Sequence, residues 1–165
     1  MREIEYGPLR LEEAEALAAL AREIWHAHYP AIISVEQIDY MLEQRYKPGL
    51  IRQTLARGDC WLVGRAGDML VGFAHGYALA EGDFKLDKLY VAPHQQRRGV
   101  GAELVARLIR HAQGRGARRM VLRVNRRNAQ AISAYRKYGF EVLMPVKEEI
   151  GGGFVMDDYV MTNRL

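Results

Sequence analysis

Residues 86–104, LDKLYVAPHQQRRGVGAEL, have the pattern of a short strand, a tight turn and the start of a helix. The apolar strand ends at Pro93, because proline cannot donate a hydrogen bond to a sheet. Two glycines in the segment Gln96-Arg97-Arg98-Gly99-Val100-Gly101 let the backbone curl at the mouth of the helix, so that several free N–H groups converge. The helix dipole and the two arginines add positive charge at the same point. The stretch therefore predicts a binding site for a pyrophosphate group.

Three interpretations compete for this glycine-rich turn. An ordinary turn would bind nothing, and a lone pair of glycines is weak evidence against it. A Rossmann dinucleotide site needs a small third residue where Leu104 stands, and an acid at the end of the next strand where Asn125 stands. The third interpretation comes from the segment Gln96–Gly101, which resembles at every fixed position the acetyl-CoA loop of the GNAT N-acetyltransferases, Gln/Arg-x-x-Gly-x-Gly/Ala.

A second motif follows downstream, after a predicted strand. It matches the N-x-x-A-x-x-x-Y-x-x-x-G-F pattern of the same superfamily at Asn128, Ala131, Tyr135, Gly139 and Phe140. An alanine and a tyrosine four residues apart are ordinary helix neighbours when they occur alone. Together with the preceding turn they are specific, and the chain is identified by resemblance as a GNAT N-acetyltransferase. The resemblance is strong over residues 60–140, whereas both ends of the chain resemble the PaiA-like polyamine acetyltransferases more loosely.

The composition is that of a soluble globular protein, with 49% hydrophobic and 27% charged residues. A chain of 165 residues can bury its own core, so residues 1–165 are expected to form a single domain. No apolar run is long enough for a membrane span, and the amino terminus lacks the pattern of a signal peptide. The single cysteine, Cys60, fits a reducing cytoplasm, and its apolar strand favours an inert thiol over a nucleophile.

Positive charge is concentrated in residues 94–136, which hold eleven arginines and one acid, Glu103. This net charge of +10 leaves −6 for the rest of a chain whose total is +4. The basic part is suited to a polyanion and the acidic remainder to a cation. Nucleic acid is the less favoured candidate for this polyanion. Proteins that bind nucleic acid interleave aromatic with basic residues, and Tyr135 is the one aromatic residue in the basic segment here. A nucleotide-bearing cofactor is therefore favoured, with no nucleic-acid or membrane partner.

Periodicity and turn residues predict the order of the elements. A first helix is expected over residues 11–28, a second begins after a cap at Ser34, and a third covers residues 48–57. A fourth helix runs from the glycine turn to residue 113, and a fifth contains Ala131, Ile132 and Tyr135. Strands are expected over residues 2–6, 60–65, 69–79, 85–91, 120–124, 140–144 and 154–162, with an acidic, glycine-rich loop at 148–153. The resemblance implies an α/β fold of the α+β type. Its mixed, mostly antiparallel sheet of six to seven strands would have helices on both faces and a splayed parallel pair, 85–91 and 120–124.

The resemblance also implies where the co-substrate acetyl-CoA binds. Its pantetheine arm would lie between the splayed strands, where the N–H of Leu89 or Tyr90 would face the thioester carbonyl. Asn128 would hydrogen-bond the arm, and the pyrophosphate would lie on the N–H groups of residues 97–102. The implied cofactor-binding residues are Leu89, Tyr90, Val91, Gln96, Arg97, Arg98, Gly99, Val100, Gly101, Ala102, Asn128, Ala131 and Tyr135.

By the same resemblance, an amine attacks the acetyl thioester directly and Tyr135 protonates the departing thiolate; the alternative is a tyrosine packed on the sheet. An alkylamine arrives mainly as an ammonium, so a base must accept its proton. Asp87 on the central strand is the leading candidate. The alternatives are Glu81, Asp83, His75 (which is more simply a satisfied sheet histidine) and a water chain. The glutamate common in the family falls at Lys85, which leaves the base open.

The acceptor is less defined. The acidic remainder of the chain and the loose PaiA-like resemblance favour a small cationic primary amine such as a polyamine. Other possible acceptors are a protein or peptide amino terminus, an amino acid and an aminoglycoside. A non-catalytic acyl-CoA sensor is the alternative function, and a homodimer stays open.

No metal site is expected, because His26 and His28 point to different faces of their helix. The amino-terminal helical region could form one wall of a substrate cleft.

Overall fold

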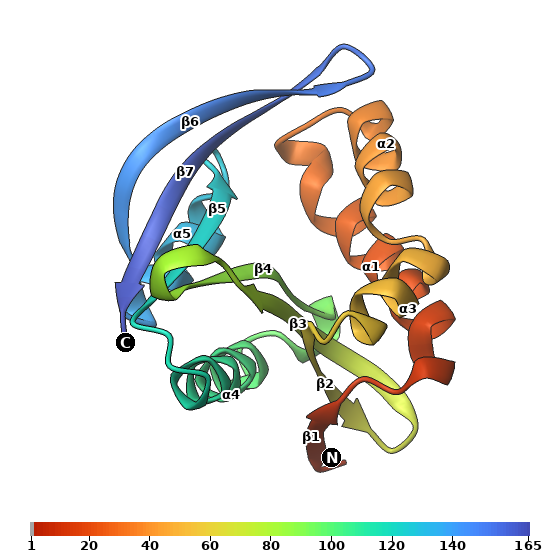
Figure 1. The fold of residues 1–165 in the computed structure, drawn as a ribbon. Helices are drawn as coiled ribbons and strands as arrows, with labels where there is room; N and C mark the ends of the chain where they lie inside the picture. Colours follow the sequence, from red (N-terminus) through yellow and green to blue (C-terminus); the bar gives the residue numbers. More distant parts are fainter. Residues whose placement is uncertain (1) are drawn as a thin grey trace.

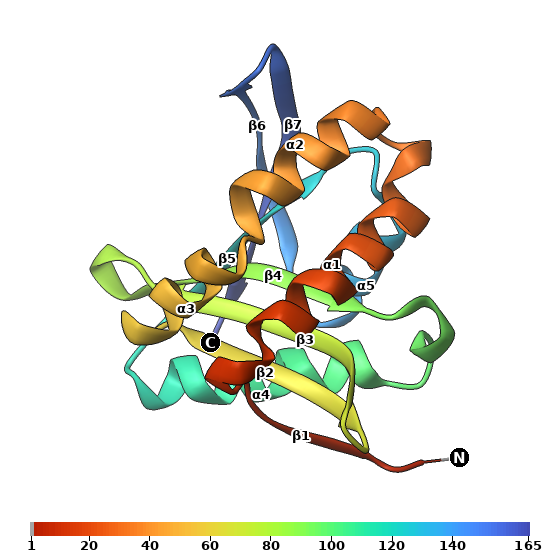
Figure 2. The same ribbon diagram turned by 90° about the vertical axis from the view of Figure 1, so that its right-hand side faces the viewer.

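The computed structural model describes residues 2–165. Within this range one sheet has the strand order β1-β2-β3-β4-β5-β7-β6, and helices cover both of its faces (Figures 1 and 2). The strands are β1 (Ile4–Pro8), β2 (Cys60–Ala66), β3 (Met69–Ala78), β4 (Asp83–Val91), β5 (Arg119–Asn125), β6 (Glu141–Gly151) and β7 (Phe154–Arg164). The helices are α1 (Ala14–His28), α2 (Val35–Arg45), α3 (Pro48–Ala56), α4 (Val100–Gly114) and α5 (Ala129–Lys137). The expected mixed sheet between two helical layers is confirmed.

The parallel pair is also confirmed, and it separates after a few residues. Strands β4 and β5 are parallel neighbours paired only at Asp83–Arg119, Phe84–Met120 and Lys85–Val121. Beyond Lys85 the two strands diverge, and β5 stays paired with β7 along its whole length. The carboxyl-terminal half of β4 therefore has an unpaired edge that faces a gap in the sheet.

A β-bulge marks the point on β4 where the gap opens. Across β3 and β4, His75 pairs with Lys88 and Gly76 with Leu86, so that Asp87 has no partner of its own. A Cβ atom at Gly76 would lie 2.6 Å from the Phe84 ring, so only glycine fits at this crowded position of β3. The bulge turns the Asp87 side chain toward the gap, where it lines a cavity.

Hydrophobic clusters on both faces of the sheet hold the layers together. The amino-terminal helices pack on one face of the sheet through a cluster that includes Trp25, Trp61 and Phe73. Helices α4 and α5 pack on the other face through a cluster that includes Leu108 and Phe140. None of the helices in residues 2–165 is long and apolar enough to cross a bilayer.

Several predicted boundaries differ from the structure, and two of the differences have a clear physical reason. The first helix begins as a 3₁₀ turn at Leu11–Glu13, where Leu11 is 57% exposed and the Glu13 carboxylate accepts from the Arg10 N–H. The strand predicted to end at residue 144 continues as β6 through Gly151 and pairs with β7, so that only Gly152 and Gly153 remain of the loop predicted at residues 148–153. Strand β6 is an edge strand exposed on much of its surface, so it lacks the apolar alternation by which a strand is found in a sequence.

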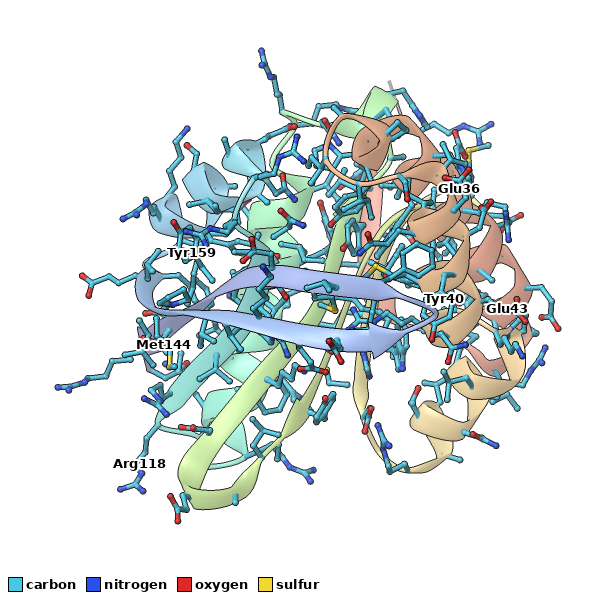
Figure 3. All side chains as sticks on the ribbon, turned by 90° about the horizontal axis from the view of Figure 1, so that it is seen from above. Glu36, Tyr40, Glu43, Arg118, Met144 and Tyr159 are labelled. Atoms are coloured by element: carbon cyan, nitrogen blue, oxygen red, sulfur yellow. The ribbon has the colours of Figure 1, made fainter. Side chains whose placement is uncertain are left out.

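The extended β6–β7 hairpin reaches across the molecule to α2, where Tyr40 lies at its tip (Figure 3). The Tyr40 hydroxyl donates to the Ile150 carbonyl at 2.9 Å, and the Gln37 amide donates to the Val155 carbonyl at 2.9 Å. The Tyr40 ring also packs on Phe154, with 5.3 Å between the ring centroids. Helix α2 and the hairpin therefore form a continuous wall beside the gap in the sheet.

Candidate active site

The amino terminus of α4 is built to hold an anion. Gly99 is the N-cap residue and has a φ of 79°, in the left-handed region that glycine adopts without strain. No side chain caps the helix, so the N–H groups of Val100, Gly101 and Ala102 have no partner within it. Free N–H groups at the positive end of a helix dipole attract phosphate. This is the geometry expected from residues 96–101.

A cleft of about 470 Å³ runs from this helix end along the gap between β4 and α5. Every residue that the resemblance assigned to the cofactor lines it except Arg98, whose guanidinium instead donates to Gln95. Residues of α5 and its carboxyl-terminal flank also line the cleft, and sequence reasoning did not assign them to the site: Gln130, Ser133, Ala134, Lys137 and Tyr138. The cleft brings the two sequence motifs face to face.

The main chain of Leu89 faces the gap. The Ala92 N–H donates to the Val71 carbonyl of β3 at 2.8 Å. Because the hydrogen-bonding edges alternate along an antiparallel strand, the main chain of Tyr90 also faces β3, and those of Leu89 and Val91 face away from it. The Gln96 side chain reaches the Val91 carbonyl at 3.3 Å from the gap side. Of the two N–H groups considered from the sequence, that of Leu89 is therefore the one available to a ligand in the gap.

Asn128 joins the cleft to the amino-terminal helices. Its side-chain oxygen caps α5 by accepting from the Ala131 N–H at 3.3 Å, and it lies 3.0 Å from His28 Nε2. Since the cap identifies this atom as an acceptor, His28 Nε2 carries the hydrogen of that contact. The Asn128 side-chain N–H₂ is left to donate elsewhere, and Asn128 lines the cleft.

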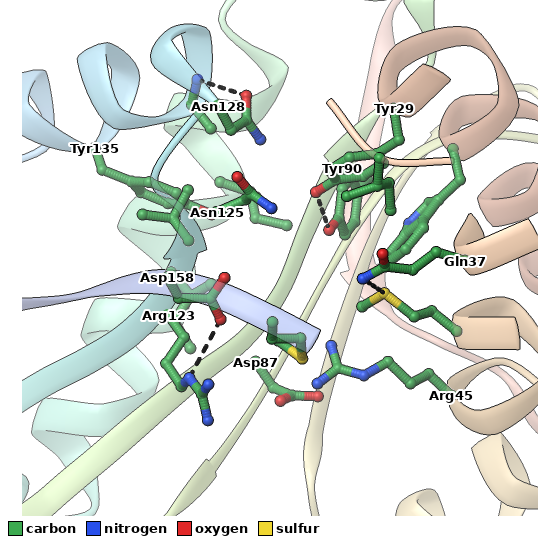
Figure 4. Close-up of a pocket in the computed structure, with 18 residues that line it drawn as sticks. Tyr29, Gln37, Arg45, Asp87, Tyr90, Arg123, Asn125, Asn128, Tyr135 and Asp158 are labelled. Carbon is green, nitrogen blue, oxygen red and sulfur yellow. Dashed lines mark hydrogen bonds and ion pairs between the residues drawn. The ribbon is translucent and has the colours of Figure 1, made fainter. Parts of the chain in front are cut away.

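A second cavity, of about 80 Å³, lies on the other side of the gap under α2 and the β6–β7 hairpin (Figure 4). It is lined by side chains from both halves of the chain, among them Tyr29, Gln37, Arg45, Asp87, Arg123, Met156 and Asp158. Five residues line both this cavity and the cleft: Leu89, Tyr90, Asn128, Ala131 and Tyr135. The two spaces therefore meet at Tyr135.

Tyr135 is buried where the cavity and the cleft meet. It projects from α5 toward the gap, and its ring packs on Phe140 and Tyr138. Burial raises the pKa of its phenol well above the ordinary value, because the phenolate would lose its hydration. The hydroxyl is therefore protonated at neutral pH and can act as a proton donor.

Asp87 belongs to a buried charge cluster. Its carboxylate lies 2.6 Å from Lys88 Nζ and 3.1 Å from His75 Nδ1, and His75 Nε2 lies 2.7 Å from Asp59. Burial raises the pKa of Asp87, but the hydrogen bonds from His75 and Lys88 and the charge of Lys88 outweigh it and hold that pKa well below its ordinary range. Asp87 is therefore ionised and already neutralised by its neighbours.

Asp158 was missed by sequence reasoning as a site residue. It lies in the middle of β7 opposite Asn125 and is only 2% exposed. Its Oδ2 atom lies 3.3 Å from Arg123 Nε, but no residue within 2–165 hydrogen-bonds that oxygen. Burial raises the pKa of Asp158, and the charges of Arg123 and Arg45 only partly offset the rise. The cavity therefore holds two carboxylates whose pKa values are shifted in opposite directions.

The remaining candidates lie away from the gap. Glu81 is exposed in a turn, and Asp83 forms a two-pronged ion pair with Arg119. His75 is buried behind Asp87, stacked on Trp61 at 4.2 Å between ring centroids, as expected for a sheet histidine. Burial raises the pKa of the Cys60 thiol to about 11, which favours the unreactive thiol form.

Comparison with known proteins agrees with this architecture. Residues 17–140 match the model of the acetyltransferase (GNAT) family. Spermidine N(1)-acetyltransferase of Thermoplasma acidophilum is 28% identical over 159 residues, 93% of this chain and 96% of that protein. The crystal structure of PaiA N-acetyltransferase from the same organism, in complex with coenzyme A, has a TM-score of 0.86 at 26% identity and covers 99% of both chains.

The fold is shared beyond these relatives. The ribosomal-protein-S18-alanine N-acetyltransferase of Escherichia coli has a TM-score of 0.74 at 17% identity, covering 98% of this chain and 94% of that one. The family model spans most of the sheet, the uncapped helix and α5, which are the elements that build the cleft. The chain belongs to the acetyltransferase (GNAT) family.

Proposed function

We propose that the protein transfers the acetyl group of acetyl-CoA to a small primary amine, with both substrates bound at once. The observation that carries this proposal is the meeting of the cleft and the cavity at Tyr135, beside an unpaired strand edge. Two substrates held on opposite sides of one gap need no covalent enzyme intermediate, because their proximity supplies the effective concentration. The coenzyme A complex of the PaiA structure supports the choice of donor.

The chain's own groups fit the donor. The N–H groups at the start of α4 would receive the pyrophosphate, and the main chain of Leu89 and Val91, which pairs with no strand on the gap side, would bind the pantetheine arm. The Leu89 N–H would stabilise the negative charge that develops on the thioester oxygen during attack. Asn128 would donate its free amide hydrogens to the arm, and Tyr135 would protonate the sulfur as it leaves.

The base we propose is Asp158 rather than Asp87. A base must be ionised to accept a proton, yet bind that proton well enough to take it from an ammonium. The raised pKa of Asp158 meets this need better than the lowered pKa of Asp87, whose charge is held by Lys88 and His75. Asp87 remains the rival candidate because its carboxylate lines the same cavity.

For the acceptor we propose a small amine that arrives as an ammonium, and spermidine is one compound to test because a relative is named for it. The excess of acidic residues outside residues 94–136 supports a cationic acceptor less than the sequence indicated, because some of these acids are already paired with arginines. Asp157 is paired with Arg126, and Glu148 with Arg123. The cytoplasm is the compartment we propose, from the single unpaired cysteine.

The proposal predicts that purified protein releases coenzyme A from acetyl-CoA only when a primary amine is present. The measurement is thiol release with a panel of polyamines, amino acids and amino-terminal peptides, with the acetylated product identified by mass spectrometry. An acyl-CoA sensor would bind the donor without turnover on any amine. A nucleic-acid module would instead show strongly salt-dependent DNA binding that coenzyme A does not displace.

The anion site gives a second prediction. Gly99→Ala adds a methyl group into open space, but at a φ of 79° that an L-residue reaches at a cost of about 1–2 kcal/mol. We expect the Kd for coenzyme A to rise about tenfold, as the loop gives up that conformation. Gly114→Ala is the matched control, since it also meets open space but has no positive φ. Equal affinity of both variants, measured by calorimetry, would contradict the site.

A further inference from the structure

The cavity under α2 and the β6–β7 hairpin, in which we place the amine, is called the acceptor cavity below. Its lining contains two acids, Asp87 and Asp158, and two arginines, Arg45 and Arg123, and all but one of these four charges have partners. Asp87 is neutralised by Lys88 and His75. Arg123 lies 2.6 Å from Glu148 and 3.3 Å from Asp158. Arg45 differs, because it forms no hydrogen bond or ion pair with any of residues 2–165.

Arg45 comes from the last turn of α2 and points into the cavity toward Asp87, with no contact between them short enough for an ion pair (Figure 4). A cation in the last turn of a helix is favoured by the helix dipole wherever its side chain points. The helix dipole therefore explains why a cation stands at this position, but an Arg45 side chain that pointed into solvent would interact with the dipole equally well. The half-buried position over the cavity needs a second reason.

The surroundings of Arg45 are more positive than the two acids and two arginines of the cavity alone would make them, because two lysines lie beside Asp87. Lys88 is 7% exposed and lies behind Asp87, and Lys85 Nζ lies 3.5 Å from the same carboxylate. Arg123 also keeps two buried nitrogen atoms, Nε and Nη2, without hydrogen-bond acceptors among the described residues. The unpaired groups of the cavity are therefore mostly donors.

A polyamine would satisfy only the acids in this set of groups. Each of its nitrogens is a donor, so its second ammonium would lie among guanidinium groups and an occupied carboxylate. Like charges brought together in this way oppose binding. A ligand that combines one ammonium with one carboxylate would place the ammonium at Asp158, whose Oδ2 has an ion pair with Arg123 but no hydrogen bond, and the carboxylate at Arg45.

We infer that the acceptor is an amine that also carries a carboxylate, an amino acid in the broad sense, and that Arg45 binds its carboxylate. This inference rests on the proposed acetyl transfer and specifies its acceptor. The carboxylate would be held by the planar guanidinium, which can donate two parallel hydrogen bonds to it.

The test uses pairs of acceptors that differ only by the carboxylate: ornithine with putrescine, lysine with cadaverine, and β-alanine with ethylamine. We expect kcat/KM to be higher for the acid-bearing member of each pair by about ten- to a hundredfold, the range for a hydrogen-bonded charge. Arg45→Gln should remove this preference, mainly through KM, and Arg45→Lys should retain part of it. Arg22→Gln, at an exposed arginine of α1 outside the cavity, is the matched control.

Each outcome is decisive. If putrescine, cadaverine and spermidine are the better acceptors, or if Arg45→Gln leaves the preference unchanged, the inference is wrong while acetyl transfer stands. If no amine of either kind yields an acetylated product, the proposed function fails, and the inference fails with it. Binding of coenzyme A by each variant shows separately that the fold is intact.

Discussion

Replacing Tyr135 by phenylalanine is expected to lower kcat by about a hundred- to ten-thousandfold, the range for the loss of a general acid. The ring would stay in place, because its packing on Phe140 and Tyr138 does not involve the hydroxyl. Burial raises the pKa of Tyr135, so the wild-type phenol keeps its proton throughout the neutral range. Without that proton the thiolate must leave unprotonated or take a proton from water.

The measurement is kcat at saturating amine and acetyl-CoA, with the Kd for coenzyme A determined in parallel. Affinity should change little, since the cleft is otherwise intact. Tyr138→Phe is a matched control, because Tyr138 lines the cleft but not the acceptor cavity. A Tyr135→Phe enzyme with the wild-type rate would mean that Tyr135 is only a packing residue.

The part of the site that lies within short segments could be predicted from the sequence. The glycine turn and the Asn128–Tyr135 spacing each fold locally, and the parallel crossover between them fixes their relative position. The mixed sheet and its splayed parallel pair followed from the same resemblance. Local patterns and a shared fold therefore predicted most of the residues that line the cleft.

The acceptor side could not be found in this way. Gln37 and Arg45 reach the cavity only because the hairpin docks on α2, and Asp158 faces it because β7 pairs with β5 in one register. The contacts between α2 and the hairpin join residues more than a hundred positions apart in the chain. One local signal was present: neighbouring side chains on a strand point to opposite faces, so one of Asp157 and Asp158 had to face inward.

Asp158→Asn is expected to lower kcat/KM by about a hundred- to ten-thousandfold, the range for the loss of a general base. It is also expected to leave the melting temperature unchanged or raise it. Because the folded protein raises the pKa of Asp158, the ionised carboxylate destabilises the fold at pH 7. Asparagine removes that charge. The stability advantage of the variant should shrink as the pH falls through the raised pKa, where the wild-type carboxyl becomes neutral.

Asp87→Asn provides the matched comparison, since the same substitution should have the opposite effect on stability. The folded protein lowers the pKa of Asp87, so its ionised form stabilises the fold above the ordinary carboxyl pKa. Removing the charge leaves Lys88 buried without its partner, at a cost of about 3–5 kcal/mol. Thermal melts of both variants at pH 7 measure the two signs directly.

The pH dependence of the rate then separates the two acids. If Asp158 is the base, the acid limb of the wild-type kcat/KM profile reports its raised pKa and is absent from Asp158→Asn. Arg123, Arg45 and Asp157 are the charged groups that act on this carboxyl, and Arg45→Gln should move the limb to higher pH because a favourable positive charge is lost. A profile unchanged in Asp158→Asn but abolished in Asp87→Asn, measured below the melting temperature of each, would assign the base to Asp87 instead.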